Sequence, residues 1–331
     1  MLDVKQNQLA VGIDIGGTNL RGAVVDHTGQ IKAFLHTASP INNPVQGQKV
    51  IVDTVYRLAA QAGTCVENLA GLGLGIPGWM DRLRGELIFA PKMAHWQNIV
   101  TLDALRRELG IPVYAASDPN VATLGELWKG AGQGSRNFIM ITLGTGLGCG
   151  IVIDGKLYVG HHGMAGEFGH IAFCAAAEPV CDCGMIGCIE TQAAGPAIAR
   201  LGRQALASGQ PTLLHDLVMG RAEGLTTSAV FSAAQQGDPV AQAIVNCAGE
   251  RLGIGFAALV SLFEPEKIIV GGGMSEVGDL LLEPIRRAML AHCYLLARGY
   301  VTVEVVAAQL GDDAGVIGAA QLAFSSRNLS Y

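Results

Sequence analysis

The sequence contains no cluster of basic residues, and charged residues of either sign are scarce. Asp, Glu, Lys and Arg make up 15% of the 331 residues, against about 25% in an average soluble protein, and the formal net charge is −6. Because nucleic acids bind to patches of Lys and Arg, we expect no nucleic acid partner. Half of the residues are apolar, which indicates a large core and favours an α/β enzyme.

No segment has the uniform hydrophobicity of a membrane-spanning helix. The most apolar long segment, residues 239–263, is interrupted by Gln242, Asn246, Glu250 and Arg251. This pattern predicts a buried amphipathic helix and no membrane span. The first residues also lack the basic and then apolar layout of a secretion signal. We therefore expect a cytoplasmic protein without a membrane partner.

Without an export signal, disulfides are not expected among the eight cysteines. Cys181, Cys183 and Cys188 lie within eight residues, and such clustering indicates metal or redox chemistry. Cys-x-Cys is a poor redox spacing, and unligated core cysteines would not lie among glycines and Asp182. Together with His170, the three thiols predict a closed, tetrahedral Zn²⁺ site that organises the loop and takes no part in the reaction.

The pattern of strands and turns begins twice along the chain. Strands are predicted over residues 9–15, 20–26, 31–37, 71–76, 113–116, 137–143, 147–153, 267–270 and 301–306. Helices are predicted over residues 45–62, 101–109, 119–129 and 314–324, with others between 191 and 263 and after residue 273. Two halves that each open with a strand, a glycine turn and a strand predict a duplicated α/β fold with a cleft between the halves.

Three glycine turns are candidate phosphate or nucleotide contacts, because glycines let backbone N–H groups approach an anion. They are Asp14-Ile15-Gly16-Gly17-Thr18, Gly144-Thr145-Gly146 and Gly271-Gly272-Gly273. Asp14 could hold Mg²⁺ through water, and the alternative for the first turn is an ordinary type I′ hairpin. No turn continues as a Walker A loop. Residues 73–78 fit G-x-G-x-x-G, but the following residues predict a hairpin and not a helix, so this match is accidental.

Asp118 has two candidate roles. In Ser117-Asp118-Pro119-Asn120 it could be a helix N-cap with Pro119 as the first helical residue, a catalytic base, or both. Pro119 should restrict Asp118 to extended backbone angles. Glu167 and Glu190 bracket the cysteine loop and could face a polyhydroxylated ligand, although isolated glutamates are more often solvated surface residues.

Three motifs in this order resemble the ROK family of sugar kinases and repressors. They are Asp14-Ile-Gly-Gly-Thr18, Glu167-x-x-His170 and Cys181-x-Cys-Gly-x-x-Gly-Cys-x-Glu190. The resemblance runs from about Val11 to the last predicted helix. It implies an actin-like, hexokinase-like (ribonuclease H-like) α/β fold of two domains, with ATP, Mg²⁺ and a hexose in the cleft. We place the small domain at residues 1–120 plus 314–331 and the large domain, with its zinc loop, at residues 121–313.

The resemblance also implies roles for individual residues. Asp118 matches the catalytic base, and the expected sugar contacts are Gly78, Ser117, Asp118, Glu167, His170 and Glu190. The implied zinc ligands are His170, Cys181, Cys183 and Cys188. The implied nucleotide contacts are Asp14, Gly16, Gly17, Thr18, Gly144, Thr145, Gly146, Gly271, Gly272 and Gly273. A homodimer or higher homo-oligomer is a further implication, and the short lead before Val11 argues against a DNA-binding repressor.

The sequence departs from the family's pattern beside the predicted base. The family usually has Asn at the position of Ser117 and a small residue at that of Pro119, and residues 92–96 replace an Asn-Leu-Pro-Gly-Trp segment. A glucokinase is the default expectation. The alternatives are a kinase for N-acetylmannosamine, N-acetylglucosamine or fructose, and a sugar sensor without catalysis.

Overall fold

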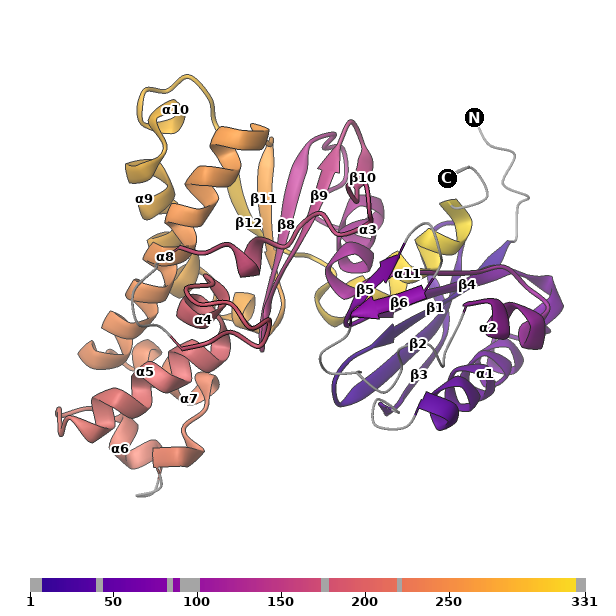
Figure 1. The fold of residues 1–331 in the computed structure, drawn as a ribbon, viewed down its shortest axis with the longest axis horizontal. Helices are drawn as coiled ribbons and strands as arrows, with labels where there is room; N and C mark the ends of the chain where they lie inside the picture. Colours follow the sequence, from indigo (N-terminus) through magenta and orange to yellow (C-terminus); the bar gives the residue numbers. More distant parts are fainter. Residues whose placement is uncertain are drawn as a thin grey trace. The chain divides into compact units, whose positions relative to one another are not determined.

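The computed structural model describes residues 8–39, 44–81, 86–89, 102–173, 179–218 and 222–325. The described residues form two five-stranded sheets and one two-stranded sheet, and Figure 1 labels their strands except β7. The first sheet has the strand order β3-β2-β1-β4-β7 and the second β10-β9-β8-β11-β12. Both place a three-stranded meander beside two strands that arrive from further along the chain. This repeated order confirms the duplicated α/β fold.

The strands lie close to their predicted positions. They are β1 (Leu9–Ile15), β2 (Asn19–Asp26), β3 (Ile31–Ala38), β4 (Leu69–Ile76), β5 (Trp79–Asp81), β6 (Glu86–Phe89), β7 (Val113–Ser117), β8 (Phe138–Leu143), β9 (Leu147–Ile153), β10 (Lys156–Tyr158), β11 (Lys267–Gly271) and β12 (Glu304–Ala307). The last strand was predicted three residues too early, because its pairing with β11 begins only at Glu304 opposite Lys267.

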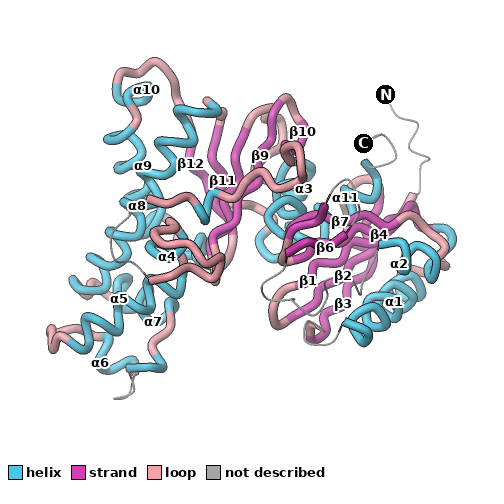
Figure 2. The backbone as a smooth tube through the Cα atoms, in the orientation of Figure 1, coloured by secondary structure: helices cyan, strands magenta, loops and turns pink. Residues whose placement is uncertain are grey.

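Helices, drawn in cyan in Figure 2, connect these strands. They are α1 (Pro44–Gln61), α2 (Leu102–Leu109), α3 (Asp118–Lys129), α4 (Glu190–Ala193), α5 (Gly195–Ala207), α6 (Leu214–Leu217), α7 (Thr227–Gln235), α8 (Pro239–Phe263), α9 (Asp279–His292), α10 (Tyr294–Ala297) and α11 (Ala314–Ser325). Short 3₁₀ turns include Phe168–His170, Gly273–Val277 and Gly311–Asp313.

The side-chain alternation of β1 explains how the first sheet is covered. Val11, Ile13 and Ile15 are buried in a core cluster with apolar residues of α1 and α2. The alternate residues face α11, where Ala10 packs with Val316 and Ala320. Since successive side chains of a strand point to opposite faces, Asp14 lies on the α11 face.

On that face, glycines let α11 approach the backbone of the sheet. A Cβ added to Gly12 would lie 2.0 Å from the carbonyl oxygen of Val316, and one added to Gly73 would lie 1.8 Å from that of Ala319. The same holds where α11 crosses α3, since a Cβ on Gly318 would lie 1.6 Å from the carbonyl oxygen of Val121. Gly73 therefore serves the packing of α11 on the sheet. β5 and β6 pair antiparallel after this strand, which confirms that the G-x-G-x-x-G match is accidental.

By its internal contacts the chain divides into two compact units. Unit 1 comprises Met1–Arg136, Gly150–Gly166 and Gln309–Tyr331, and unit 2 comprises Asn137–Cys149 and Glu167–Ala308. The division differs from the expected boundary at residue 120 because α3 packs on α11 and so belongs to unit 1.

α8 is the central helix of unit 2. A Cβ on Gly253 would lie 2.4 Å from the carbonyl oxygen of Ile285 in α9, and one on Gly255 would lie 2.5 Å from the ring of Phe168. Within the described part of the chain, α8 is the one helix long and apolar enough to span a membrane, and 61% of its most apolar window is buried in the protein. The core helix of a soluble protein can be equally long and apolar, and the burial of α8 agrees with the predicted buried helix.

Candidate active site

In unit 1, the predicted site residues gather at one edge of the first sheet. β1, β4 and β7 are parallel neighbours, with Asp14 opposite Gly75 and Ile76 opposite Ser117. The carboxyl ends of these three strands therefore carry the predicted site residues of unit 1. They are Asp14 and residues 16–18 at the end of β1, Gly78 after β4, and Ser117 and Asp118 at the end of β7. Open α/β sheets bind their ligands at this edge.

The first glycine turn presents free backbone donors. The Gly16 N–H closes the turn on the Asn19 carbonyl at 2.8 Å, and Gly17 and Thr18 are exposed. Neither glycine has a positive φ, so the turn is not type I′, which requires positive φ at both central residues. In the described residues no acceptor is recorded for the N–H groups of Gly17 and Thr18. The turn can therefore donate to an anion.

Asp14 lies beside this turn and against the first turn of α11. A Cβ on Gly315 would lie 2.4 Å from Asp14 Oδ2, and one on Gly75 would lie 3.0 Å from Oδ1. Burial raises the pKa of the Asp14 carboxyl to about 6, an effect opposed by Arg21 and reinforced by Asp312. A cation beside this half-buried carboxylate, or a water held by one, would stabilise its charged form.

Arg21 and Asp312 were missed by sequence reasoning. The Arg21 guanidinium pairs with the Asp312 carboxylate and donates to the Asp312 carbonyl at 3.0 Å. This pair ties β2 to the 3₁₀ turn before α11 and so fixes the helix start against which Asp14 lies. Because 291 residues separate the partners, no local spacing could have indicated the pair.

The structure corrects the predicted start of α3. Ser117 is the N-cap, with φ −62° and ψ 152°, and Asp118 already belongs to the helix, so Pro119 is its second residue. The expectation that Pro119 holds Asp118 in extended backbone angles is wrong, because Asp118 is the first residue of the helix and the extended residue is Ser117. A proline this early in a helix is tolerated, since it removes only an N–H that has no intrahelical acceptor. The Ser117 hydroxyl makes no capping hydrogen bond. Asp118 is therefore not the cap, and its exposed carboxylate lies in the first turn of α3.

In unit 2, two glycine turns follow adjacent parallel strands, with Gly271 opposite Thr142. The Gly144 N–H closes its turn on the Gly146 carbonyl at 3.0 Å. Gly272 has φ 82°, and a Cβ there would lie 2.3 Å from the Leu143 carbonyl oxygen. Glycine is thus required where the second turn passes the end of β8.

The four predicted zinc ligands come together in unit 2. One donor atom each from His170, Cys181, Cys183 and Cys188 lies within 4.8 Å of all the others. Cys183 Sγ lies 3.6 Å from Cys188 Sγ, and Cys181 Sγ lies 3.5 Å from His170 Nδ1. Ligand atoms of a tetrahedral zinc site lie roughly 3.4–3.8 Å apart, so the cluster fits a closed structural Zn²⁺ site. Burial raises the pKa of the Cys181 thiol to about 12, so metal binding must displace a proton there.

The two predicted sugar-contact glutamates are connected to this cluster. His170 turns Nδ1 toward Cys181, and its Nε2 lies 3.9 Å from Glu167 Oε2. A metal-bound histidine is commonly oriented by such a carboxylate. Glu190 is half-buried and its Oε2 accepts a hydrogen bond from the Leu147 N–H at 2.7 Å. The alternative of two solvated surface glutamates is therefore wrong for Glu190.

Residues 10–326 match the profile of the ROK family. The chain belongs to the ROK family. Among its relatives, the glucokinase of Halalkalibacterium halodurans is 37% identical over 321 residues, which cover 96% of each chain. The glucokinase of Streptomyces coelicolor is 38% identical over 319 residues, covering 95% of this chain and 97% of the relative.

A solved structure shows the same fold. The ROK family glucokinase of Streptomyces griseus, determined with glucose and AMPPNP, has a TM-score of 0.80 and 39% identity and covers 96% of this chain and 99% of its own. This similarity confirms the actin-like, hexokinase-like fold. The chain is thus glucokinase-like over its full length. The departing segment at residues 92–96 lies outside the described residues.

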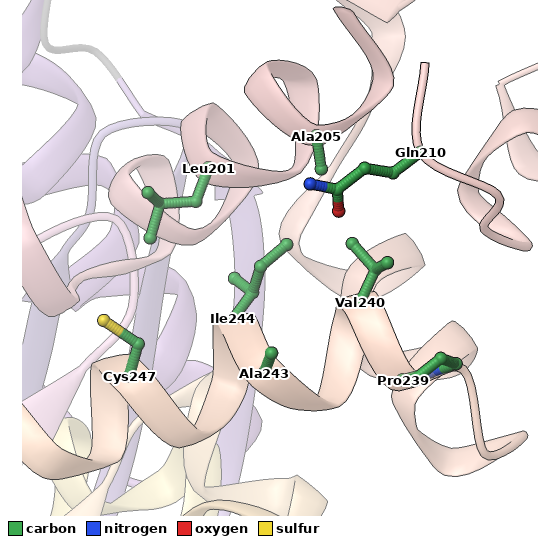
Figure 3. A pocket seen from close by; sticks show the side chains of 8 residues that line it. All are labelled: Leu201, Ala205, Gln210, Pro239, Val240, Ala243, Ile244 and Cys247. Carbon is green, nitrogen blue, oxygen red and sulfur yellow. The ribbon is translucent and has the colours of Figure 1, made fainter. Parts of the chain in front are cut away.

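An apolar groove of unit 2 contains none of these candidate site residues. It lies between α5 and α8, has a volume of about 420 Å³, and is lined by Leu201, Val240, Ile244 and Cys247 among others, with Gln210 at its polar end (Figure 3). No charged residue lines it, so it offers nothing to a phosphate and little to a sugar.

Proposed function

We propose that the chain is an ATP-dependent hexose kinase that converts glucose to glucose 6-phosphate, with Asp118 as the general base. The observation that carries this proposal is the similarity to glucokinases from end to end, at 37% and 38% identity. The placement of Asp14, the turn at 16–18 and Asp118 at one carboxyl edge supports it.

In this reaction Asp118 accepts the proton of the sugar hydroxyl while the hydroxyl oxygen attacks the γ-phosphorus. The new O–P bond forms as the bond to the ADP oxygen breaks. A positioned base contributes about 10²–10⁴-fold to the rate. Most of the remaining catalysis in phosphoryl transfer comes from positioning the phosphates and offsetting their charge.

The nucleotide would be held by backbone and small side chains. The free N–H groups at Gly17 and Thr18 and those of Thr145 and Gly146 would bind the phosphates, and the Gly271–Gly273 turn would border the adenosine. Asp14 would hold Mg²⁺ through water, and the ion would neutralise phosphate charge. These assignments rest on the exposed turns and the empty space beside Gly17, Gly144 and Gly273.

The proposed sugar contacts are Gly78, Ser117, Asp118, Glu167, His170 and Glu190. Structural Zn²⁺ on His170, Cys181, Cys183 and Cys188 would fix the loop that carries the last three contacts. We further propose a cytoplasmic protein that acts as a homodimer or higher homo-oligomer.

A panel of sugars in a coupled ADP-release assay tests the proposal. With purified, zinc-loaded protein, Mg²⁺ and ATP, glucose should release ADP with the highest kcat/KM among glucose, fructose, N-acetylglucosamine and N-acetylmannosamine. A higher value for another sugar would move the assignment to that substrate. Calorimetric sugar binding without ADP release from any of them would instead favour a non-catalytic sensor.

The environment of Ser117 supports a second candidate substrate, a hexose other than glucose. Ser117 is half-buried beside Asp118, and its hydroxyl is not used as a helix cap, so it is available to a ligand. A serine offers one donor where an asparagine offers two. The Ser117→Asn variant should therefore change the ranking of the sugars in the same assay, and an unchanged ranking would remove Ser117 from the specificity argument.

A further inference from the structure

Glu190 joins two features of unit 2 that sequence reasoning treats separately. It is the first residue of α4 and follows the metal ligand Cys188 by two positions. Its Oε2 accepts from the Leu147 N–H at 2.7 Å, and its Oε1 lies 3.7 Å from Cys181 Sγ. A single carboxylate therefore reaches from the thiol cluster to the first residue of β9, directly after the Gly144–Thr145–Gly146 turn.

The turn depends on this carboxylate and on the chain that follows it. A Cβ on Gly146 would lie 2.8 Å from Glu190 Oε2, so the carboxylate packs directly against the turn. On the other side, the Gly144 carbonyl accepts from the Gly195 N–H at 2.9 Å. Residues 190–195 thus hold both ends of the turn, while the N–H groups of Thr145 and Gly146 have no recorded acceptor in the described chain.

The position of Glu190 depends in turn on the metal loop. Few backbone hydrogen bonds hold the described part of the loop between His170 and Cys188. Examples are the bonds from the Phe173 N–H to the Gly187 carbonyl and from the Cys181 N–H to the Met185 carbonyl. A metal bound to four side chains would be the principal constraint on such a loop, because structural zinc supplies folding free energy directly. The loop end at Cys188 leads straight into Glu190.

From this geometry we infer that Glu190 is a positioning residue that transmits metal occupancy to the turn at 144–146. With the metal bound, Glu190 holds the Leu147 N–H and keeps the turn in the form that receives nucleotide phosphates. When the metal leaves, this hydrogen bond is lost and nucleotide binds more weakly. The nucleotide part rests on the proposed function, whereas the effect on Leu147 does not.

The test compares zinc-loaded and chelator-stripped full-length protein in the absence of sugar. Hydrogen exchange at the Leu147 amide and the calorimetric Kd for Mg²⁺–AMPPNP are measured on both. Stripping should speed the Leu147 exchange at least about tenfold and weaken AMPPNP binding about 5- to 150-fold, the usual range of coupling between sites. Unchanged values in protein whose zinc is shown to be gone would overturn the inference.

Variants then decide whether Glu190 carries the effect. Zinc-loaded Glu190→Ala should already show fast Leu147 exchange and weak AMPPNP binding, and stripping should change it little further. Glu190→Gln, which keeps the shape and one acceptor, should lie between Glu190→Ala and the parent, and it replaces Glu190→Ala if that variant does not fold or loses zinc. Glu250→Ala, an exposed glutamate of α8, is the matched control and should behave as the parent. If zinc removal weakens AMPPNP binding by the same factor in Glu190→Ala as in the parent, the effect of zinc does not pass through Glu190 and the inference is wrong.

The two proposals fail in different ways. A zinc-loaded parent that does not bind AMPPNP would contradict the proposed function, while the exchange at Leu147 would still decide the coupling. A parent that binds AMPPNP equally with and without zinc would contradict the coupling and leave the proposed function in place.

Discussion

Asp118 is exposed in the first turn of α3, directly after the N-cap Ser117. If it is the general base, Asp118→Asn keeps the size of the side chain but removes the group that accepts the proton. We expect kcat to fall about 10²–10⁴-fold, with the calorimetric affinities for sugar and nucleotide nearly unchanged. The measurement is kcat in the coupled ADP assay together with the two affinities.

Asp103→Asn is the matched control, because Asp103 is also an acidic residue in the first turn of a helix of unit 1 and has no predicted catalytic role. It should leave kcat unchanged. Near-normal turnover by Asp118→Asn would remove Asp118 from the mechanism.

Within single elements, the best-defined N-cap is that of α8. Asp238 is 4% exposed, and its carboxylate accepts from the N–H groups of Ala241 at 2.7 Å and Leu213 at 2.8 Å and from the Thr212 hydroxyl at 3.0 Å. Asp238→Ala would remove the acceptor of the buried Ala241 N–H and of two partly buried donors, so we expect a loss of about 2–3 kcal/mol in the free energy of unfolding. Denaturant titration measures it. Thr226→Ala, which removes the exposed cap of α7, should cost less.

The same cap makes stability depend on pH. Burial alone would raise the pKa of Asp238, but the hydrogen bonds from Ala241, Leu213 and Thr212 hold it below its usual range. A lowered pKa means that the native state favours the carboxylate, so the contribution to stability is present above about pH 4 and is lost as the pH falls through the folded-state pKa. The difference in unfolding free energy between the parent and Asp238→Asn should therefore shrink in acid. A difference that stays constant down to pH 3 would contradict this assignment.

The packing of α11 on the first sheet gives a prediction about glycine. In Gly73→Ala the new Cβ would lie 1.8 Å from the carbonyl oxygen of Ala319, and since this neighbour is backbone, the whole helix must move. We expect a loss of about 3 kcal/mol or more. Gly224→Ala is the control, because no atom lies within 4 Å of its added Cβ. Equal melting temperatures for the two variants would show that α11 packs more loosely than described.

Helices and strands with a regular sequence pattern could be predicted. Features that depend on contacts between distant segments could not. The β-rich runs at residues 9–15 and 147–153, each beside a glycine turn, predicted β1 and β9 to the residue. The start of α3 was missed by one residue, because local preferences alone favoured Asp118 as the cap. For the glycine-rich segment at residues 71–78, the sequence correctly predicted that the G-x-G-x-x-G match is not a cofactor site, but it did not predict the packing role. That role required α11, which comes more than 200 residues later in the sequence.

For the molecule as a whole, the duplication was visible in the sequence but the boundaries of the units were not. Unit 1 is assembled from Met1–Arg136, Gly150–Gly166 and Gln309–Tyr331, so contacts between distant segments define it. The cluster of His170, Cys181, Cys183 and Cys188 could be predicted because cysteine spacing is a local signal. The Arg21–Asp312 pair and the contact of Glu190 with Leu147 depend on the three-dimensional arrangement and leave no local signal.

Glu126 holds together two of the segments from which unit 1 is built. Its side chain is fully buried, and its carboxylate accepts from the N–H groups of Ala131 at 2.6 Å and, from the last segment, of Gln309 at 3.0 Å and Leu310 at 2.8 Å. Glu126→Ala would remove the buried carboxylate that accepts from these partly buried N–H groups, so we expect a loss of about 3 kcal/mol and faster hydrogen exchange at Gln309 and Leu310. Glu67→Ala, at an exposed glutamate of the same unit, should change neither. If Glu126→Ala lowers stability without faster exchange at these two amides, Glu126 stabilises α3 alone and does not tie the last segment into unit 1.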